Sequence, residues 1–272
     1  MYKNYIFDLY GTLIDINTDE NYDELWEEMA NFYAINHAEY TPSELKDAYH
    51  RICKIEEAKH IKKYKEIKHH EIDVHNVFKR LYSDRNVKVS TQSVTATAQY
   101  FRILSTKYIK LYDGAIEFLK SLRNKGKKVY LLSNAQHDFT YYEILFLDIE
   151  KYFDGILLSS NEKCKKPDHY FYQILFDRYN LEKNESIMIG NDKSSDIKGA
   201  NDFGIDSLYF YSNISPIEDL SLPNTSTYVV DGVDGSNKVL AAPKETAYKF
   251  QELAGGTGSL TVYQDFILAS KE

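Results

Sequence analysis

The sequence has little cysteine, and its two residues, Cys53 and Cys164, exclude a disulfide framework. Their spacing is also not that of a metal site, so the pattern indicates a reducing compartment. Long apolar runs are lacking as well, because none approaches the roughly 18 residues of a membrane span. The opening residues, MYKNYIFDLYGTL, do not show the basic and then apolar pattern of a secretion signal. We therefore expect a cytoplasmic protein without a membrane partner.

Positive charge is in the minority. The 272 residues include 33 Lys and Arg against 41 Asp and Glu, which gives a formal net charge of −8. This balance disfavours general binding to nucleic-acid backbones or anionic lipids. The 43% hydrophobic and 27% charged residues are ordinary for a globular protein and exclude a chain that is disordered as a whole. We expect a small molecule as the partner, and the oligomeric state stays open.

Short apolar strands alternate with helical segments over most of the chain. Strands are predicted at 4–9, 129–134, 155–159, 186–189 and 207–211, and helical spacing occurs at 115–122, 168–179 and 195–203. Strands that alternate with helices predict an α/β fold with a doubly wound parallel sheet. In such a sheet, ligands bind outside the carboxyl ends of the strands.

A helical insert interrupts this alternation. Apolar residues recur at three- and four-residue spacing within 22–33 and 42–57, and Thr41 before Pro42 is typical of a helix start. His69, His70 and His75 of the insert do not all share one helical edge, so we expect them on a solvated face. The predicted domains are an α/β core of 1–17 and 108–232, a helical domain of 18–107, and a tail of 233–272.

The tail does not continue the α/β alternation. Its pattern is compatible with a helix over 243–253 and a final strand over 260–269, between glycine-rich turns. Two readings stay open for these residues: an accessory segment of unknown purpose, or the remnant of an expression tag.

Side chains that can do chemistry follow the predicted strands in a fixed order: an acid, a hydroxyl with an amide, a lysine, and a group of acids. Taken alone, an acid at the end of a strand is more often a turn or helix-cap residue. Taken together, these side chains are expected to meet at one edge of a parallel sheet. They are Asp8, Thr12, Ser133, Asn134, Lys166, Asn191, Asp192 and Asp196.

This ordered set resembles the haloacid dehalogenase superfamily of hydrolases, over about residues 1–230. The resemblance implies a Rossmann-like α/β core with an inserted α-helical cap domain. It also implies that Asp8 is the nucleophile and forms an aspartyl-phosphate, which splits a difficult hydrolysis into two steps. Ser133 and Lys166 would bind the phosphoryl oxygens. Thr12 and Asn134 would help to bind the substrate.

The same resemblance implies a magnesium ion, Mg²⁺. Its ligands would be Asp8, the backbone carbonyl of Tyr10 and residues of the last motif, since magnesium prefers oxygen ligands and retains waters. In that motif Asp192 is the first choice and Asn191 offers a neutral oxygen. Asp196 would hold a metal-bound water or orient Lys166.

One residue departs from the phosphatases of this superfamily, which carry a second aspartate two residues after the nucleophile as general acid and base. Here that position is Tyr10, and Asp-x-Tyr-Gly-Thr is similar to the 2-haloacid dehalogenases, as is Tyr172, six residues after Lys166. Dehalogenases work without metal, however, and Asp192 would repel the charge of Asp8 unless a cation lay between them.

The sequence therefore favours a magnesium-dependent hydrolase of small phosphorylated metabolites, with a phosphate ester as substrate. Two alternatives stay open. One is dehalogenase-like hydrolysis of a carbon–halogen bond, and the other is a catalytically weak binding or regulatory protein. Metal dependence separates the first two readings, and metal binding without turnover of any phosphate ester would mark the third.

Overall fold

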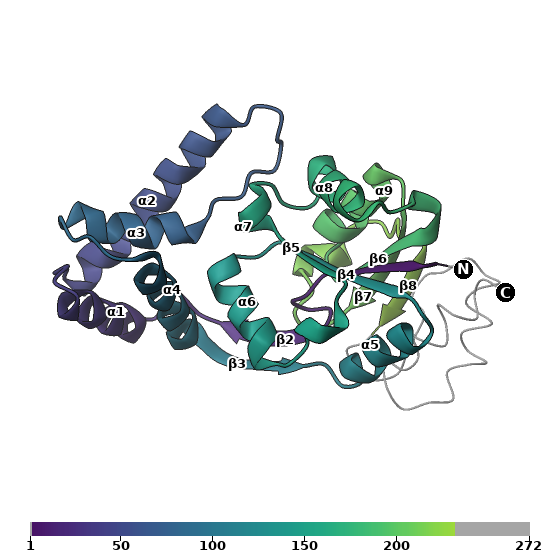
Figure 1. Ribbon diagram of the computed structural model, residues 1–272, viewed down its shortest axis with the longest axis horizontal. Helices are drawn as coiled ribbons and strands as arrows, with labels where there is room; N and C mark the ends of the chain where they lie inside the picture. The colour runs from purple at the N-terminus through teal and green to yellow at the C-terminus, as the bar shows by residue number, and fades with distance from the viewer. Residues whose placement is uncertain (1, 232–272) are drawn as a thin grey trace.

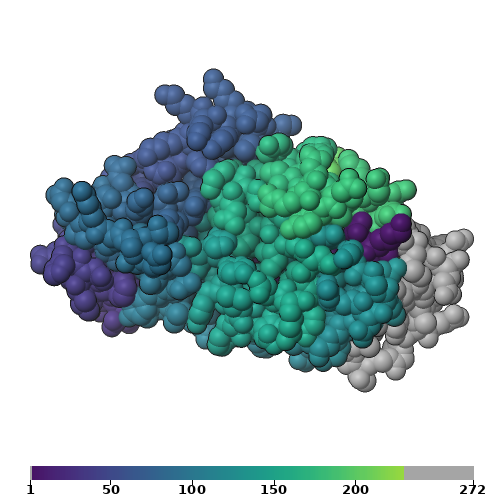
Figure 2. Space-filling model, viewed as in Figure 1, coloured from purple at the N-terminus to yellow at the C-terminus, as the bar shows by residue number. Residues whose placement is uncertain are grey.

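The computed structural model describes residues 2–231, which form an α/β part and a helical part that lie against each other (Figure 1, Figure 2). The α/β part contains one sheet of six parallel strands in the order β5-β4-β1-β6-β7-β8. The doubly wound parallel sheet expected from the sequence is confirmed. Its strands are β1 (Asn4–Phe7), β4 (Lys128–Ser133), β5 (Gly155–Leu158), β6 (Ser186–Gly190), β7 (Asp206–Tyr211) and β8 (Tyr228–Asp231).

Helices cover both faces of this sheet, with α5 and α6 on one face and α8 and α9 on the other (Figure 1). Successive residues of β1 point to opposite faces: Phe7 contacts Phe118 of α5, whereas Ile6 belongs to the cluster formed by α8 and α9. Strands buried on both faces need apolar residues at nearly every position, which explains their continuous apolar runs. The helices are α5 (Ala115–Asn124), α6 (His137–Phe146), α8 (His169–Tyr179) and α9 (Lys198–Phe203).

The helical part has its own apolar core, which includes Trp26, Tyr49, Phe78 and Phe101. Its second helix begins where the sequence predicted, because Thr41 and Glu44 form a reciprocal capping box ahead of Pro42. The helices of this part are α1 (Asp23–Ile35), α2 (Pro42–Lys63), α3 (Val74–Asp84) and α4 (Thr91–Ser105).

The chain passes from the α/β part to the helical part and back through two segments. These segments, β2 (Ile14–Thr18) and β3 (Thr106–Leu111), pair as an antiparallel ribbon. This ribbon was not predicted from the sequence. Each strand is short and partly exposed, and its partner lies far along the chain, so no local pattern reveals the pairing.

Short turns complete the fold. The segment expected to be one helix over 195–203 is instead a π-helical turn followed by α9, and Asp192 caps that turn by accepting from Ser194 N and Ser195 N. The short elements are η1 (Glu150–Tyr152), α7 (Ser159–Glu162), η2 (Lys183–Glu185), η3 (Lys193–Ile197) and η4 (Ile217–Leu220).

One expectation for the insert is wrong. His75 is not on a solvated face: its side chain is 19% exposed and its Nδ1 donates to Asp138 Oδ2 of α6 at 2.7 Å. The helix and strand considered for residues 243–253 and 260–269 lie outside the described residues. Among residues 2–231, no helix combines the length and the apolar character that a membrane crossing requires.

Candidate active site

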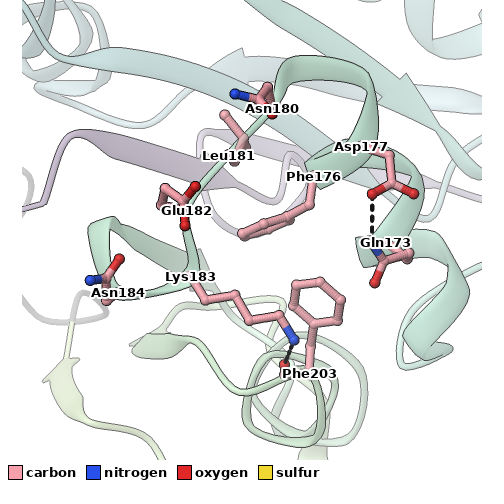
Figure 3. A pocket seen from close by; sticks show the side chains of 9 residues that line it. All are labelled: Gln173, Phe176, Asp177, Asn180, Leu181, Glu182, Lys183, Asn184 and Phe203. Carbon is pink, nitrogen blue, oxygen red and sulfur yellow. Dashed lines mark hydrogen bonds between the residues drawn. The ribbon is translucent and has the colours of Figure 1, made fainter.

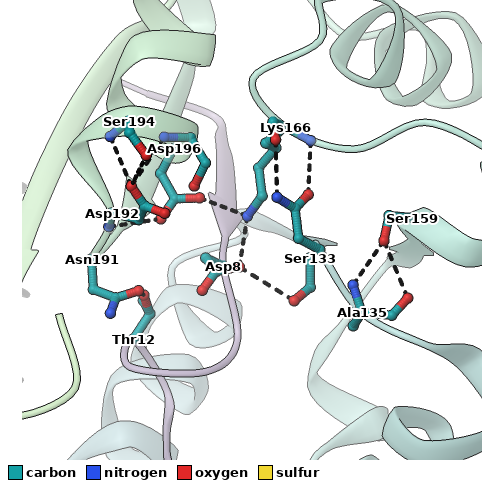
Figure 4. A network of polar contacts seen from close by, with 12 residues as sticks. Asp8, Thr12, Ser133, Ala135, Ser159, Lys166, Asn191, Asp192, Ser194 and Asp196 are labelled. Carbon is teal, nitrogen blue, oxygen red and sulfur yellow. Dashed lines mark hydrogen bonds and ion pairs between the residues drawn. The ribbon is translucent and has the colours of Figure 1, made fainter. Parts of the chain in front are cut away.

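Three of the expected side chains meet beside the carboxyl ends of neighbouring strands (Figure 4). Asp8 follows β1, Ser133 ends β4, and Lys166 lies in the segment before α8. Ser133 Oγ donates to Asp8 Oδ1 at 3.2 Å, and Lys166 Nζ donates to the same oxygen at 2.6 Å. One carboxylate oxygen of Asp8 therefore carries both a hydroxyl and an ammonium donor.

Lys166 also forms an ion pair with Asp196, whose Oδ1 lies 2.6 Å from Nζ, and both side chains are 1% exposed. Burial alone would lower the pKa of Lys166, but the charges of Asp196 and Asp8 raise it above its usual value. Burial raises the pKa of Asp196 although Lys166 opposes the shift. One ammonium is thus shared by two carboxylates, which leaves this cluster short of positive charge.

Asn191 packs against the loop that follows Asp8. Thr12 Oγ1 donates to Asn191 Oδ1 over a long 3.5 Å, and both residues are buried. Gly11 has a φ of +83°, and a Cβ at that position would lie 2.0 Å from Asn191 Nδ2. Glycine is required there for both reasons, since the backbone is left-handed and the amide fills the space that a side chain needs.

Asp192 points into its own turn (Figure 4). Its Oδ1 accepts from Ser194 N and Ser194 Oγ, each at 2.7 Å, and from Ser195 N at 3.1 Å. Across the part of the chain that the structure describes, no three His, Cys, Asp or Glu side chains are gathered so that they could hold a metal ion. The acids expected as joint ligands are engaged within the protein. Asp192 Oδ1 binds its own turn, Asp196 Oδ1 pairs with Lys166, and Asp196 Oδ2 accepts from Asp192 N at 3.1 Å.

The phenol of Tyr10 is engaged away from this cluster. It donates to Glu143 of α6, and Thr140 Oγ1 lies 2.8 Å from its oxygen. Arg102 of α4 pairs with Glu143 at 2.6 Å and lies over the Tyr10 ring. Burial raises the pKa of Tyr10 above its usual value. Sequence reasoning missed Glu143 and Arg102, because they come from different helices and no spacing connects them.

Asn134 binds the backbone of Lys166 through both the nitrogen and the oxygen of its side-chain amide. Its Nδ2 donates to Lys166 O at 3.0 Å, and its Oδ1 accepts from Lys166 N at 2.7 Å. Tyr172, fully buried, donates to the backbone oxygen of Asp196 at 2.9 Å. These two residues hold the segments of the cluster together.

A separate cavity of about 550 Å³ is lined by residues from the end of α8 to η2 and by Phe203 (Figure 3). Because η2 directly precedes β6, the cavity lies at the amino end of that parallel strand, opposite to the end of the sheet at which Asp8 follows β1. Its lysine, Lys183, donates to Phe203 O and lies 3.7 Å from the centre of the Phe203 ring. The ammonium of Lys183 is therefore engaged by Phe203, and none of the residues that line the cavity belongs to the Asp8 cluster.

The chain is similar in sequence to known hydrolases. Residues 2–204 match the family model described as haloacid dehalogenase-like hydrolase. A glyceraldehyde 3-phosphate phosphatase from Pyrococcus abyssi is 26% identical, over 77% of this chain and 82% of the relative. A phosphorylated carbohydrates phosphatase from Thermotoga maritima is 24% identical, over 75% of this chain and 82% of the relative.

A solved structure shares the fold. The 2-haloacid dehalogenase from Pseudomonas syringae superposes with a TM-score of 0.52 at 15% identity, over 83% of this chain and 90% of that one. At this identity the likeness concerns the arrangement of strands and helices alone.

Proposed function

This chain belongs to the haloacid dehalogenase-like hydrolase family, and we propose on that premise that it is a magnesium-dependent hydrolase of small phosphorylated metabolites. The observation that carries the proposal is the shared engagement of Asp8 by Ser133 and Lys166. A carboxylate flanked by a hydroxyl and an ammonium suits attack on a phosphoryl group, because the same donors can take up the charge of the phosphoryl oxygens. The two phosphatase relatives support a phosphate ester as substrate.

In the proposed reaction Asp8 attacks phosphorus, so that a bond from its carboxylate forms while the bond to the leaving oxygen breaks. Water then cleaves the aspartyl-phosphate, which releases phosphate and restores the carboxylate. Ser133 and Lys166 would hold the phosphoryl oxygens through both steps. Asp196 would keep Lys166 in place, since the two are buried as an ion pair.

The donors around Asp8 fit a magnesium ion that keeps several waters. Two carboxylates share one ammonium here, so a phosphate group that enters the site needs a further cation. The Asp8 carboxylate, the Tyr10 carbonyl and the Asn191 amide are hard oxygen donors of the kind that magnesium takes beside waters and substrate phosphate. When bound, the ion would neutralise charge on the phosphoryl group. Asp192 and Asp196 stay proposed as further ligands, directly or through water.

The dehalogenase-like alternative is favoured by the surroundings of Tyr10. A phenol that donates to Glu143 and has a raised pKa is not placed to serve as the acid and base that phosphatases have at this position. The third reading, a catalytically weak binding protein, follows from the same feature, because hydrolysis of the aspartyl-phosphate would be slow without a base.

The test is a screen of phosphorylated metabolites with and without magnesium, run beside chloride release from 2-chloropropionate. We expect phosphate release that requires magnesium and that disappears in Asp8→Asn, because an amide keeps the shape of the carboxylate but is a far poorer nucleophile. Asp177→Asn, an exposed acid on α8, is the matched control and should retain turnover. Metal-independent chloride release would favour the dehalogenase reading, and magnesium binding without turnover would favour the regulatory one.

A further inference from the structure

The segment from the end of α2 to the first residue of α3, residues 64–74, belongs to the helical part by sequence but packs on the α/β part. We call it the strap. Its Ile67 is buried in the apolar cluster beneath α8, together with Cys164 and Phe171. A segment that contributes a buried side chain to another part's core is held there by hydrophobic burial as well as by hydrogen bonds. The strap is therefore docked on the α/β part.

The strap binds the chain on both sides of Lys166. Lys165 N donates to His69 O at 2.9 Å, and Glu71 N donates to Lys163 O at 3.2 Å. Beyond the lysine, Asp168 accepts from the strap: its Oδ2 receives Lys68 N at 2.7 Å and His69 N at 2.9 Å. These bonds bracket the residue whose ammonium contacts Asp8.

The strap also reaches the segment that carries Ser133. The side chain of Gln136 donates through Nε2 to Glu71 Oε1 at 3.1 Å and to Ile72 O at 3.0 Å. Its Oε1 accepts from Val74 N at 3.0 Å. Both the nitrogen and the oxygen of the Gln136 side-chain amide thus hold the strap. Gln136 lies three residues after Ser133, whose hydroxyl contacts Asp8.

We propose that the strap fixes the segments of Ser133 and Lys166 relative to Asp8, and that Asp168 and Gln136 are positioning residues for the reaction. This inference rests on the proposed function, because it concerns the same site. Neither residue contacts Asp8; each acts by holding a neighbour in the sequence. A displacement of about 1 Å in a group that binds the reacting atoms can lower a rate about a hundredfold, so small movements of Lys166 matter.

Two substitutions release the strap at its two anchors. Asp168 uses both of its oxygens: Oδ2 accepts from the strap, and Oδ1 accepts from Tyr170 N. Asp168→Asn leaves one acceptor oxygen, which cannot serve both. Gln136→Ala removes the other anchor. We expect each variant to lose about tenfold in kcat, equal to about 1.4 kcal/mol of barrier, with KM changed less than about twofold.

The double variant decides whether the strap acts as one unit. If both anchors hold the same element, Asp168→Asn combined with Gln136→Ala should be no more than about twofold slower than the slower single variant. Losses that multiply would show separate roles and overturn the proposal, as would a raised KM with unchanged kcat. Glu66→Gln, an exposed strap residue, is the matched control and should behave as the parent protein.

Hydrogen exchange tests the strap without turnover. The amides of Lys68 and His69 should exchange faster in Asp168→Asn, and also in Gln136→Ala, although Gln136 bonds only the other end of the strap. Protection that persists at Lys68 and His69 in Gln136→Ala would overturn the coupling. A parent protein that hydrolyses no phosphate ester contradicts the proposed function, whereas these exchange rates still decide whether the strap is one unit.

Discussion

The side chain of Tyr10 connects the loop after Asp8 to the helical part through Glu143 and Arg102. Its phenol bonds to Glu143, which in turn pairs with Arg102 of α4. This chain of contacts gives Tyr10 a structural role that an aspartate at the same position would not fill, because an aspartate would face the charge of Glu143. Tyr10 can offer its backbone carbonyl to a metal while its side chain binds elsewhere.

We predict that Tyr10→Phe retains kcat within about threefold and lowers the free energy of unfolding by about 1 kcal/mol, the typical net value of one hydrogen bond. The reason is that Glu143 keeps its pair with Arg102 when the hydroxyl is removed. Steady-state kinetics and urea unfolding measure the two effects. Tyr142→Phe, an exposed tyrosine on α6, is the control. A loss of about a hundredfold or more in kcat would instead make the phenol a general acid or base.

At this same scale, sequence reasoning could locate some residues and not others. Asp8, Ser133 and Lys166 follow elements of one parallel sheet, so their proximity could be inferred from the rule for strand ends. Asp192 follows a strand in the same way, but its carboxylate is taken up by its own turn. Such a local cap competes with metal binding, and the sequence pattern does not distinguish the two.

Helix α6 joins the two parts of the molecule. Its first turn carries Asp138, which accepts from His75 of α3 and lies 3.4 Å from Thr95 Oγ1 of α4. Burial alone would raise the pKa of Asp138, but hydrogen bonds from His137 and His75 outweigh it and lower the pKa. A carboxyl group with a lowered pKa stabilises the folded state above its ordinary titration range, and that contribution is lost as the pH falls.

We therefore predict that Asp138→Asn is less stable than the parent protein at pH 7, and that the difference shrinks as the pH falls to about 3, through and below the ordinary range of an aspartate. The folded carboxylate binds fewer protons than the unfolded one in that interval, so the parent loses stability more steeply. Urea midpoints at several pH values measure this. Parallel curves for the two proteins would show that folding does not lower the pKa of Asp138, and would contradict the prediction.

Elements were predictable where their pattern is local. Five strands of the sheet and the start of α2 follow from apolar runs and from Thr41 and Pro42, whereas the edge strand β8 was not predicted. The ribbon of β2 and β3 was missed because Ile14–Thr18 pairs with residues that follow the whole helical part. The docking of the strap was missed for the same reason, since its partners, Gln136 and Asp168, follow later strands.

At the scale of the whole molecule, the helical part and the α/β part lie side by side (Figure 2). The helical part has its own apolar core, and the sheet has an apolar cluster on each of its faces. The division proposed from the sequence, with 18–107 as a helical domain, would let each part fold around its own core. Contacts across the boundary oppose this independence. Phe139 of α6 is buried in the core of the helical part, and Ile67 of the strap is buried in the apolar cluster of the α/β part beneath α8.

These exchanged side chains should make unfolding cooperative. Phe139 packs against Phe101 and Phe78, so Phe139→Ala would leave a cavity among rings and cost about 3–5 kcal/mol. We predict one calorimetric transition for the parent protein and, in Phe139→Ala, an earlier transition for the helical part, whose contacts are mostly local. Phe146→Ala, which removes a side chain that is 65% exposed on the same helix, should leave one transition. Two transitions in the parent would mean that Phe139 and Ile67 do not couple the cores, and that the helical part unfolds as an independent domain.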